Sequence, residues 1–378
     1  MRPLRGALVL SLTLVAAGCS GDGGGGSSGV VAQEPATTTT VVPAPPVPSP
    51  GPAGPAEAAA PPAAGPATTV TTGPPAPPKP PTRVGTPAKG VLVIGEKGAA
   101  LADAPGGRTA GRLREGVTVA YTAIDGDWVH VLTPCENRAW ARLDRGSRLV
   151  EAEVVVDAGH GGGETGAIGP TGLQEKELNL DISRRVVRLL EAEGVKAVLT
   201  RRTDYRVTIA SRVAIAAALS PKAFVSVHHN AEPDETRANP GSETYYQVAS
   251  PDSKRLSGLL YEEILQALSA FPAQWMGDRD AGAKTRLNLE SRDYYGILRR
   301  SFDAGVPAAL VESAFVSNPS EEELLRRDDV REAEAVAVTR GLLRYLRGND
   351  PGSGYVDAYV RHAPAGGGGG SAGCVDPS

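Results

Sequence analysis

Two histidines and two glutamates of this 378-residue chain have the residue types and positions expected of a metal hydrolase. His160 lies in the glycine-rich stretch VVVDAGHGGG, directly after an apolar run, and Glu175 follows where a helix should begin. His228 lies near the end of the run FVSVHHN, and Glu312 ends the apolar run AALVE. Together the four residues indicate a zinc hydrolase.

The chemistry follows from the ligand types. Two neutral imidazoles and one carboxylate leave Zn²⁺ an open position for water, the arrangement of catalytic rather than structural zinc. Zinc lowers the pKa of that water to about 7, so a peptide or amide carbonyl becomes open to attack. Glu312, the fourth residue, would accept the water proton and pass it to the leaving amine.

Each of these features alone has a simpler explanation. A GHGGG loop is often only a turn, a glutamate at a helix start complements the helix dipole, and an acid at a strand end can be structural. Arg212 and Asn230 are candidates for orienting neighbours or substrate, although an arginine on a helix is more often a salt-bridge partner. The joint occurrence of the four residues, in order on one α/β pattern, carries the hypothesis.

The elements that must position these residues alternate between strand and helix over residues 151–348. Their spacing predicts an α/β fold, with a mostly parallel sheet flanked by helices. In such sheets, ligands gather outside the carboxyl ends of the strands, where His160, His228 and Glu312 are expected. We expect strands at 154–157, 195–200, 223–227 and 307–312, an edge strand at 241–248, and helices at 176–193, 207–219, 252–270 and 330–346.

Residues 89–150 contain short alternating runs separated by Gly, Asp and Pro turns, which predicts a small all-β module. The stretches GDWVHV and AWARL resemble a bacterial SH3-like domain, whose relatives often bind wall peptides or glycans. Trp128 and Trp140 are candidates for a binding surface, but aromatic residues at strand spacing are more often part of the core. We therefore expect both in the core.

The first 19 residues carry two arginines, an apolar stretch and then Gly18 and Cys19, which indicates an export signal too short to span a bilayer. The residues before Cys19 resemble a bacterial lipobox, so Cys19 is the expected lipid attachment site. The alternative is an ordinary cleaved signal with a spare cysteine. We expect an exported protein, lipid-anchored at the outer face of the cytoplasmic membrane and reaching into the cell wall.

Residues 20–88 are rich in Gly and Ser and then in Pro, Ala and Thr, and 18 of the 32 prolines lie between Pro35 and Pro87. Such a segment buries too little apolar surface to offset its ordering entropy, so a disordered linker is expected. A Gly-rich disordered tail is expected at 349–378. Cys135 and the tail residue Cys374 are either free thiols or a pair.

The overall charge excludes one class of partner. The formal net charge is -4, and the chain has no run of lysine or arginine, so it lacks the electrostatic pattern of a nucleic-acid-binding protein. The sequence identifies neither a protein activator nor an oligomeric state.

From Val154 to about Leu346 the chain resembles the zinc-dependent N-acetylmuramoyl-L-alanine amidases. The resemblance implies that His160, Glu175 and His228 bind one Zn²⁺, that Glu312 is the general base, and that the substrate is peptidoglycan. This chain departs from the family pattern at Ala158, His229 and Ala314, where proline, alanine and glycine, respectively, are usual. The matching stretches are DAGHGG, GAIGPTGLQEKELNLDI, LTRRTD, SRVAIA, VSVHHN and VESAFVSNPSEE.

His229 beside His228 raises the question of which imidazole binds the metal. Neighbours on a strand point to opposite faces, and the spacing to Asn230 favours His228. Two other functions remain: an inactive, membrane-tethered protein that binds or regulates the cell wall, and a zinc carboxypeptidase acting on the stem peptide. The presence of Glu312 argues against the binding protein, since binding requires no base.

Overall fold

Two main sheets organise the part of the chain that the computed structural model describes, residues 88–144, 146–357 and 369–378. The expected export signal, Cys19 and all but the last residue of the expected linker lie outside these residues. Within the described ranges, no helix is both long and apolar enough to cross a membrane.

The N-terminal sheet contains seven strands in the order β3-β2-β6-β5-β4-β1-β7, and its pairs are antiparallel. The regular elements within 90–150 are all strands, while the bounds of the module and its SH3-like identity stay predictions. Trp128 and Trp140 were expected in the core, but both are only half-buried. The strands are β1 (Gly90–Val93), β2 (Ala99–Ala102), β3 (Thr109–Leu113), β4 (Thr118–Asp125), β5 (Trp128–Leu132), β6 (Arg138–Arg142) and β7 (Arg148–Val150).

The second sheet is mixed and has the order β14-β12-β15-β10-β8-β9. All its pairs are parallel except β12 with β15, so the expectation of a mostly parallel sheet is confirmed. The strand expected at the edge, β12, instead lies inside the sheet, because the short β14 pairs with its other side. The strands are β8 (Val154–Ala158), β9 (Ala197–Leu199), β10 (Ala223–Asn230), β12 (Glu243–Tyr246), β14 (Ala283–Lys284) and β15 (Ala308–Phe315); β11 (Glu235–Thr236) and β13 (Met276–Gly277) pair separately.

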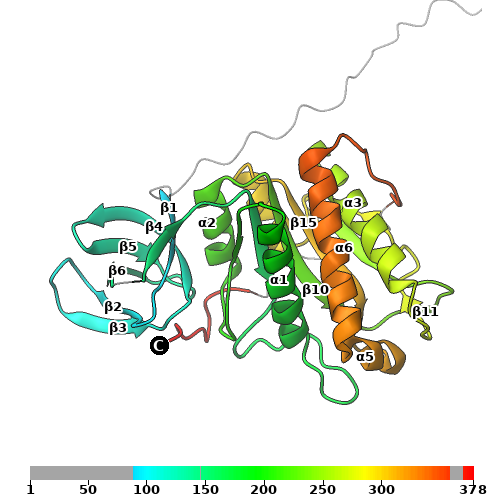
Figure 1. The fold of residues 1–378 in the computed structure, drawn as a ribbon, viewed down its shortest axis with the longest axis horizontal. Helices are drawn as coiled ribbons and strands as arrows, with labels where there is room; N and C mark the ends of the chain where they lie inside the picture. Colours follow the sequence, from blue (N-terminus) through cyan, green and yellow to red (C-terminus); the bar gives the residue numbers. More distant parts are fainter. Residues whose placement is uncertain (1–87, 145, 358–368) are drawn as a thin grey trace, which may run out of the picture. The chain divides into compact units, whose positions relative to one another are not determined.

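Helices cover both faces of this sheet (Figure 1). Val154 and Val156 of β8 pack in a core with α1, α3 and α6, whereas the intervening Val155 packs in a core with α2 and α4. This alternation follows from the pleat of a strand, in which successive side chains point to opposite faces. The helices are α1 (Glu175–Ala192), α2 (Ile209–Leu219), α3 (Pro251–Leu268), α4 (Gly296–Asp303), α5 (Pro319–Leu325) and α6 (Asp328–Arg347).

The C-terminal residues make specific contacts, although the Gly-rich composition predicted disorder for 349–378. Tyr355 bridges to Ala283 of β14, and its hydroxyl donates to the Lys254 carbonyl of α3 at 3.2 Å. Cys374 forms a disulfide with Cys135, which settles the pairing that the sequence left open. The described parts of the tail, 349–357 and 369–378, therefore belong to the folded structure.

Candidate metal centre

Strand alternation places His228 and Glu312 on the same face of the sheet. Phe224 of β10 and Leu310 of β15 belong to the core on the α2 and α4 side. His228 lies four residues after Phe224, Glu312 lies two after Leu310, and the two are direct partners in the parallel register. The sequence prediction that these strand ends converge is thus confirmed in geometry.

His160 occupies a tight turn directly after β8. Its φ of 59° is in the left-handed region, which is uncommon for a residue with a side chain and typical of a constrained functional turn. Arg212 of α2 holds this turn, since its Nη2 donates to the His160 carbonyl at 2.7 Å and its Nη1 donates to Asp157 Oδ1 at 2.5 Å. A Cβ atom at Gly159 would lie 2.3 Å from the His228 ring, so a larger residue there would displace that ring.

Glu175 is the first residue of α1, where the positive end of the helix dipole favours a carboxylate. Both of its oxygens are also hydrogen-bonded by the protein. Oε2 accepts from the Ala167 amide at 2.8 Å, and Oε1 accepts from Asn179 Nδ2 at 3.0 Å and from the His229 amide at 3.2 Å. These donors fix the orientation of the carboxylate before any ligand binds.

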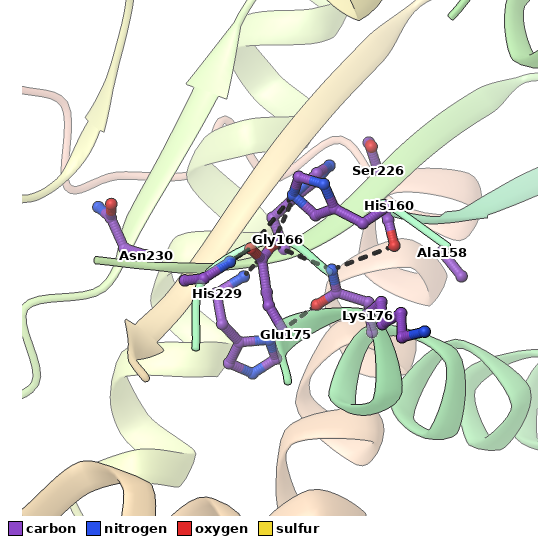
Figure 2. A network of polar contacts seen from close by, with 12 residues as sticks. Ala158, His160, Gly166, Glu175, Lys176, Ser226, His229 and Asn230 are labelled. Atoms are coloured by element: carbon purple, nitrogen blue, oxygen red, sulfur yellow. Dashed lines mark hydrogen bonds and ion pairs between the residues drawn. The ribbon is translucent and has the colours of Figure 1, made fainter. Parts of the chain in front are cut away.

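Three of the four residues identified from the sequence meet at one point. One potential ligand atom from each of His160, Glu175 and His228 lies within 4.8 Å of the others. His160 Nε2 is 3.1 Å from Glu175 Oε2, and His228 Nδ1 is 2.9 Å from Glu175 Oε1. Figure 2 shows the polar contacts that converge here, with His160 and Glu175 labelled. Two imidazoles and a carboxylate are a donor set that suits a divalent transition metal such as zinc.

His229 does not share this cluster. Its ring is fully buried and lies 2.9 Å (Nδ1) from Asn179 Oδ1 of α1 and 3.2 Å (Nε2) from Glu334 Oε2 of α6. These contacts are on the sheet face opposite His228. The expectation from alternation, that His228 rather than His229 faces the candidate metal centre, agrees with this arrangement.

The pKa values of the two carboxyl groups, Glu175 and Glu312, are shifted in opposite directions. Burial alone would raise the pKa of Glu175, but hydrogen bonds from His160 and His228 outweigh it and hold that pKa well below its usual value. Burial, followed by the charges of Glu175 and Glu243, raises the pKa of Glu312 well above its usual value. Among the described residues, Glu312 Oε2 is buried without a hydrogen-bond partner, so no protein donor competes for it.

A cavity of about 500 Å³ is lined by His160 and His228, two of the three residues. His160, His228 and Arg212 contribute its polar wall, and Tyr295 and Ile297 contribute to its apolar wall. Gly369, from the C-terminal segment, also lines it. A pocket with mostly apolar walls and a few convergent polar groups is typical of a small-molecule or substrate site.

Sequence reasoning missed part of this arrangement. Asn179 received no role, although it lies with Leu178, Ile182 and Val186 among the buried residues of α1. An asparagine on the buried face of an amphipathic helix is a detectable signal, because buried amides need partners. Arg201, fully buried, was also missed; its guanidinium donates to the Ala158 and Gly159 carbonyls at 2.9 and 2.8 Å. Asn230 lies nearby and donates to Glu243 Oε2 at 3.1 Å, outside the cluster.

Comparison with known proteins adds independent information. LytC, an N-acetylmuramoyl-L-alanine amidase of Bacillus subtilis, is 36% identical over 201 residues, which cover 53% of this chain and 36% of LytC. The amidase AmiC of Neisseria meningitidis is 29% identical over 223 residues, which cover 51% of this chain and 52% of AmiC. The chain therefore spans about a third to a half of the length of these relatives.

A solved structure, that of the N-acetylmuramoyl-L-alanine amidase AmiC2 of Nostoc punctiforme, matches 51% of this chain and 96% of its own, with 34% identity and a TM-score of 0.43. The family model described as N-acetylmuramoyl-L-alanine amidase, Amidase_3, matches residues 154–344, about half of the chain and the whole stretch that holds the candidate site. The chain belongs to the N-acetylmuramoyl-L-alanine amidase family of the Amidase_3 type.

Proposed function

We propose that this protein is a zinc-dependent peptidoglycan hydrolase that cleaves the amide between the lactyl group of N-acetylmuramic acid and L-alanine of the stem peptide. The observation that carries the proposal is the convergence of His160, Glu175 and His228 within 4.8 Å. Glu312 is the direct partner of His228 in the sheet register. A site that only binds metal does not need this additional acid, whereas a hydrolase needs a general base.

The donor set fits zinc, and the chain's own residues supply the rest of the chemistry. Bound there, Zn²⁺ would lower the pKa of a water molecule and polarise the substrate carbonyl. Glu175 accepts hydrogen bonds from the Ala167 and His229 amides and from Asn179, and donors of this kind favour the anionic form of a carboxylate. Glu312 would accept the proton from the attacking water and donate it to the leaving amine of L-alanine, a role that suits a carboxyl group whose pKa is raised.

The pocket walls support a substrate with both polar and apolar parts. Arg212 is held by Asp157 and by the His160 carbonyl, so it serves the turn rather than a ligand. Tyr294, Tyr295 and Ile297 contribute aromatic and apolar surface, on which sugar rings and alanine methyl groups can pack. This composition is compatible with the junction of glycan and peptide in peptidoglycan.

We also propose that the protein is exported and held at the outer face of the cytoplasmic membrane through lipid on Cys19. The support is the sequence alone: an apolar stretch that follows two arginines and ends in a lipobox-like cysteine. Mass spectrometry of the membrane-bound mature protein should find Cys19 as the acylated N-terminal residue. A mature protein whose Cys19 is unmodified would contradict the anchor.

The reaction is tested by incubating the purified, metal-loaded chain with peptidoglycan and identifying the products by mass spectrometry. Intact stem peptides that begin with a free L-alanine amine are expected, together with glycan strands that lack peptide. Release of single amino acids would instead indicate a zinc carboxypeptidase. Absence of any cleavage, with metal bound at one ion per chain, would identify a wall-binding or regulatory protein.

A further inference from the structure

A buried chain of polar side chains runs from α6 through β10 to the candidate metal centre. Glu334 of α6, His229 of β10 and Asn179 of α1 are all fully buried, and each contacts the next. Asn179 in turn donates to Glu175 Oε1 at 3.0 Å. Four side chains from three elements are therefore linked, and the last one is a candidate metal ligand.

The Glu175 carboxylate determines which atom donates and which accepts in each of these hydrogen bonds. Glu175 is an acceptor, so the amide nitrogen of Asn179 must point to it and the amide oxygen must point to His229. An amide oxygen only accepts, hence His229 Nδ1 carries a proton. His229 Nε2 shares the remaining contact with the Glu334 carboxyl group at 3.2 Å.

We propose that His229 is a positioning residue: with Glu334 behind it, it fixes the Asn179 amide so that Asn179 holds Glu175 in the orientation that binds the metal. This inference rests on the proposed function. Groups that hydrogen-bond to metal ligands commonly contribute 10–100-fold to metal affinity. The His229 backbone amide contacts Glu175 directly, whereas its side chain acts on the metal centre through Asn179, from the opposite face of the sheet.

Burying the Glu334 carboxyl group costs free energy unless its oxygens have hydrogen-bond partners. Glu334 has 0% side-chain exposure, and within the described ranges its Oε1 has no hydrogen-bond partner. Its contact with His229 is therefore its main compensation for burial. A merely structural histidine would affect folding stability through Glu334, whereas a positioning histidine would affect metal affinity through Asn179, and the two roles can be separated.

Two matched substitutions separate them. In His229→Asn, the amide nitrogen takes the place of Nδ1, so the donation to Asn179 remains and the contact with Glu334 is lost. In His229→Gln, the longer side chain places its amide near the position of Nε2, so the contact with Glu334 remains and the donation to Asn179 is lost. Each variant therefore keeps one of the two side-chain contacts of His229 and loses the other.

The experiment measures zinc affinity by chelator competition and thermal stability without metal, on the whole chain. His229→Gln should weaken zinc affinity about 10–100-fold with a small change in Tm, and Asn179→Ala should match it in affinity. His229→Asn should keep zinc affinity within about threefold and lower Tm. The Co²⁺-substituted protein should show an altered visible spectrum in His229→Gln and an unaltered one in His229→Asn.

The outcomes distinguish this inference from the proposed function. If the parent chain binds zinc but both variants bind it equally well, or both lose affinity in proportion to their loss of Tm, the positioning role is wrong while the hydrolase remains. If the parent chain binds no zinc at His160, Glu175 and His228, the proposed function itself fails.

Discussion

Glu175 and Glu312 are chemically identical, yet their surroundings shift their pKa values in opposite directions. Burial would raise the pKa of Glu175, but hydrogen bonds from His160 and His228 lower it, and three further protein donors also contact its carboxylate. Glu312 is half-buried, and desolvation, followed by the charges of Glu175 and Glu243, raises its pKa. In the proposed mechanism, this divergence would give one site a stable anion and a proton carrier from a single residue type.

The first prediction tests this division of roles at Glu312. Glu312→Gln removes the proton acceptor but leaves the three proposed ligands in place, so the variant should bind one metal ion and lose amidase turnover by about 10²–10⁴-fold. Metal content and the rate of stem-peptide release are measured on the same sample. Glu290→Gln, at an exposed position, is the control and should keep full activity. An active Glu312→Gln enzyme would show that another group serves as base.

A second prediction concerns Asp293, which is buried next to the tyrosines of the pocket wall. Burial raises the pKa of Asp293 to about 6, compared with about 3.9 in an unfolded chain. Because the folded pKa is the higher one, this group stabilises the fold fully only below about pH 4, and the contribution is lost as pH rises through about 6. Its Oδ1 accepts from the Val248 amide at 2.8 Å, which asparagine can also do.

Asp293→Asn should therefore reduce the fall in Tm between pH 4.5 and pH 7.5 and raise Tm at the higher pH. The measurement is thermal unfolding with chelator present throughout, so that metal release does not contribute to the pH dependence. Asp125→Asn, on an exposed strand end, is the control and should leave the pH profile as it is in the parent. An identical pH profile in Asp293→Asn and the parent would contradict a raised pKa at Asp293.

At the scale of elements, the alternation of side chains along a strand explains why so much of the site was predictable from the sequence. Residues of β10 alternate between the two cores, so His228 and His229 had to face opposite sides once the strand was recognised. Helix α1 was recognisable because Leu178, Ile182 and Val186 recur at helical spacing. The carboxyl ends of parallel strands then bring residues distant in sequence together.

Other parts of the fold and the site could not be predicted, because they depend on contacts between distant residues rather than on a repeating sequence pattern. The placement of β12 inside the sheet requires β14, a strand of two residues that has no detectable pattern. The pairing of His229 with Glu334 joins residues 105 apart in the sequence, which no local spacing reveals. The left-handed turn at His160 is likewise set by Arg212 and Gly159 together.

A third prediction tests how α2 supports that turn. Arg212 donates to Val207, Asp157, Ala158 and His160 with separate nitrogen–hydrogen groups, a fork that a lysine ammonium cannot reproduce. Arg212→Lys should keep the charge near Asp157 but release the His160 carbonyl, so metal affinity should fall by about tenfold or more. Chelator competition measures the loss.

Arg188→Lys, at an exposed position on α1, is the control and should have the affinity of the parent. Circular dichroism checks that Arg212→Lys is folded. Unchanged metal affinity in a folded Arg212→Lys variant would mean that the turn at His160 holds its shape without the guanidinium.

At the scale of the whole molecule, the C-terminal segment connects regions that the sequence pattern treats as separate. Cys374 is bonded to Cys135, which follows β5, and the Asp376 carboxylate accepts from the Cys135 amide at 2.9 Å. The Arg206 guanidinium donates to the Ala372 and Gly370 carbonyls, both at 2.8 Å, and the Ile209 amide of α2 donates to the Gly369 carbonyl at 2.9 Å. The segment therefore joins the β module to residues at the edge of the candidate pocket.

The last prediction follows from the length of chain that this disulfide encloses. Cys135 and Cys374 are 239 residues apart, and cross-linking so long a loop restricts the unfolded chain. Cys374→Ser should lower the free energy of unfolding by about 2–4 kcal/mol, measured with urea in the absence of reductant. Cys135→Ser and the double variant should show the same loss, because either change removes the single bond. Reductant should bring the parent to the level of Cys374→Ser and leave that variant unchanged. Losses that add in the double variant would show that each sulfur stabilises the fold by its own packing, and that the cross-link contributes little.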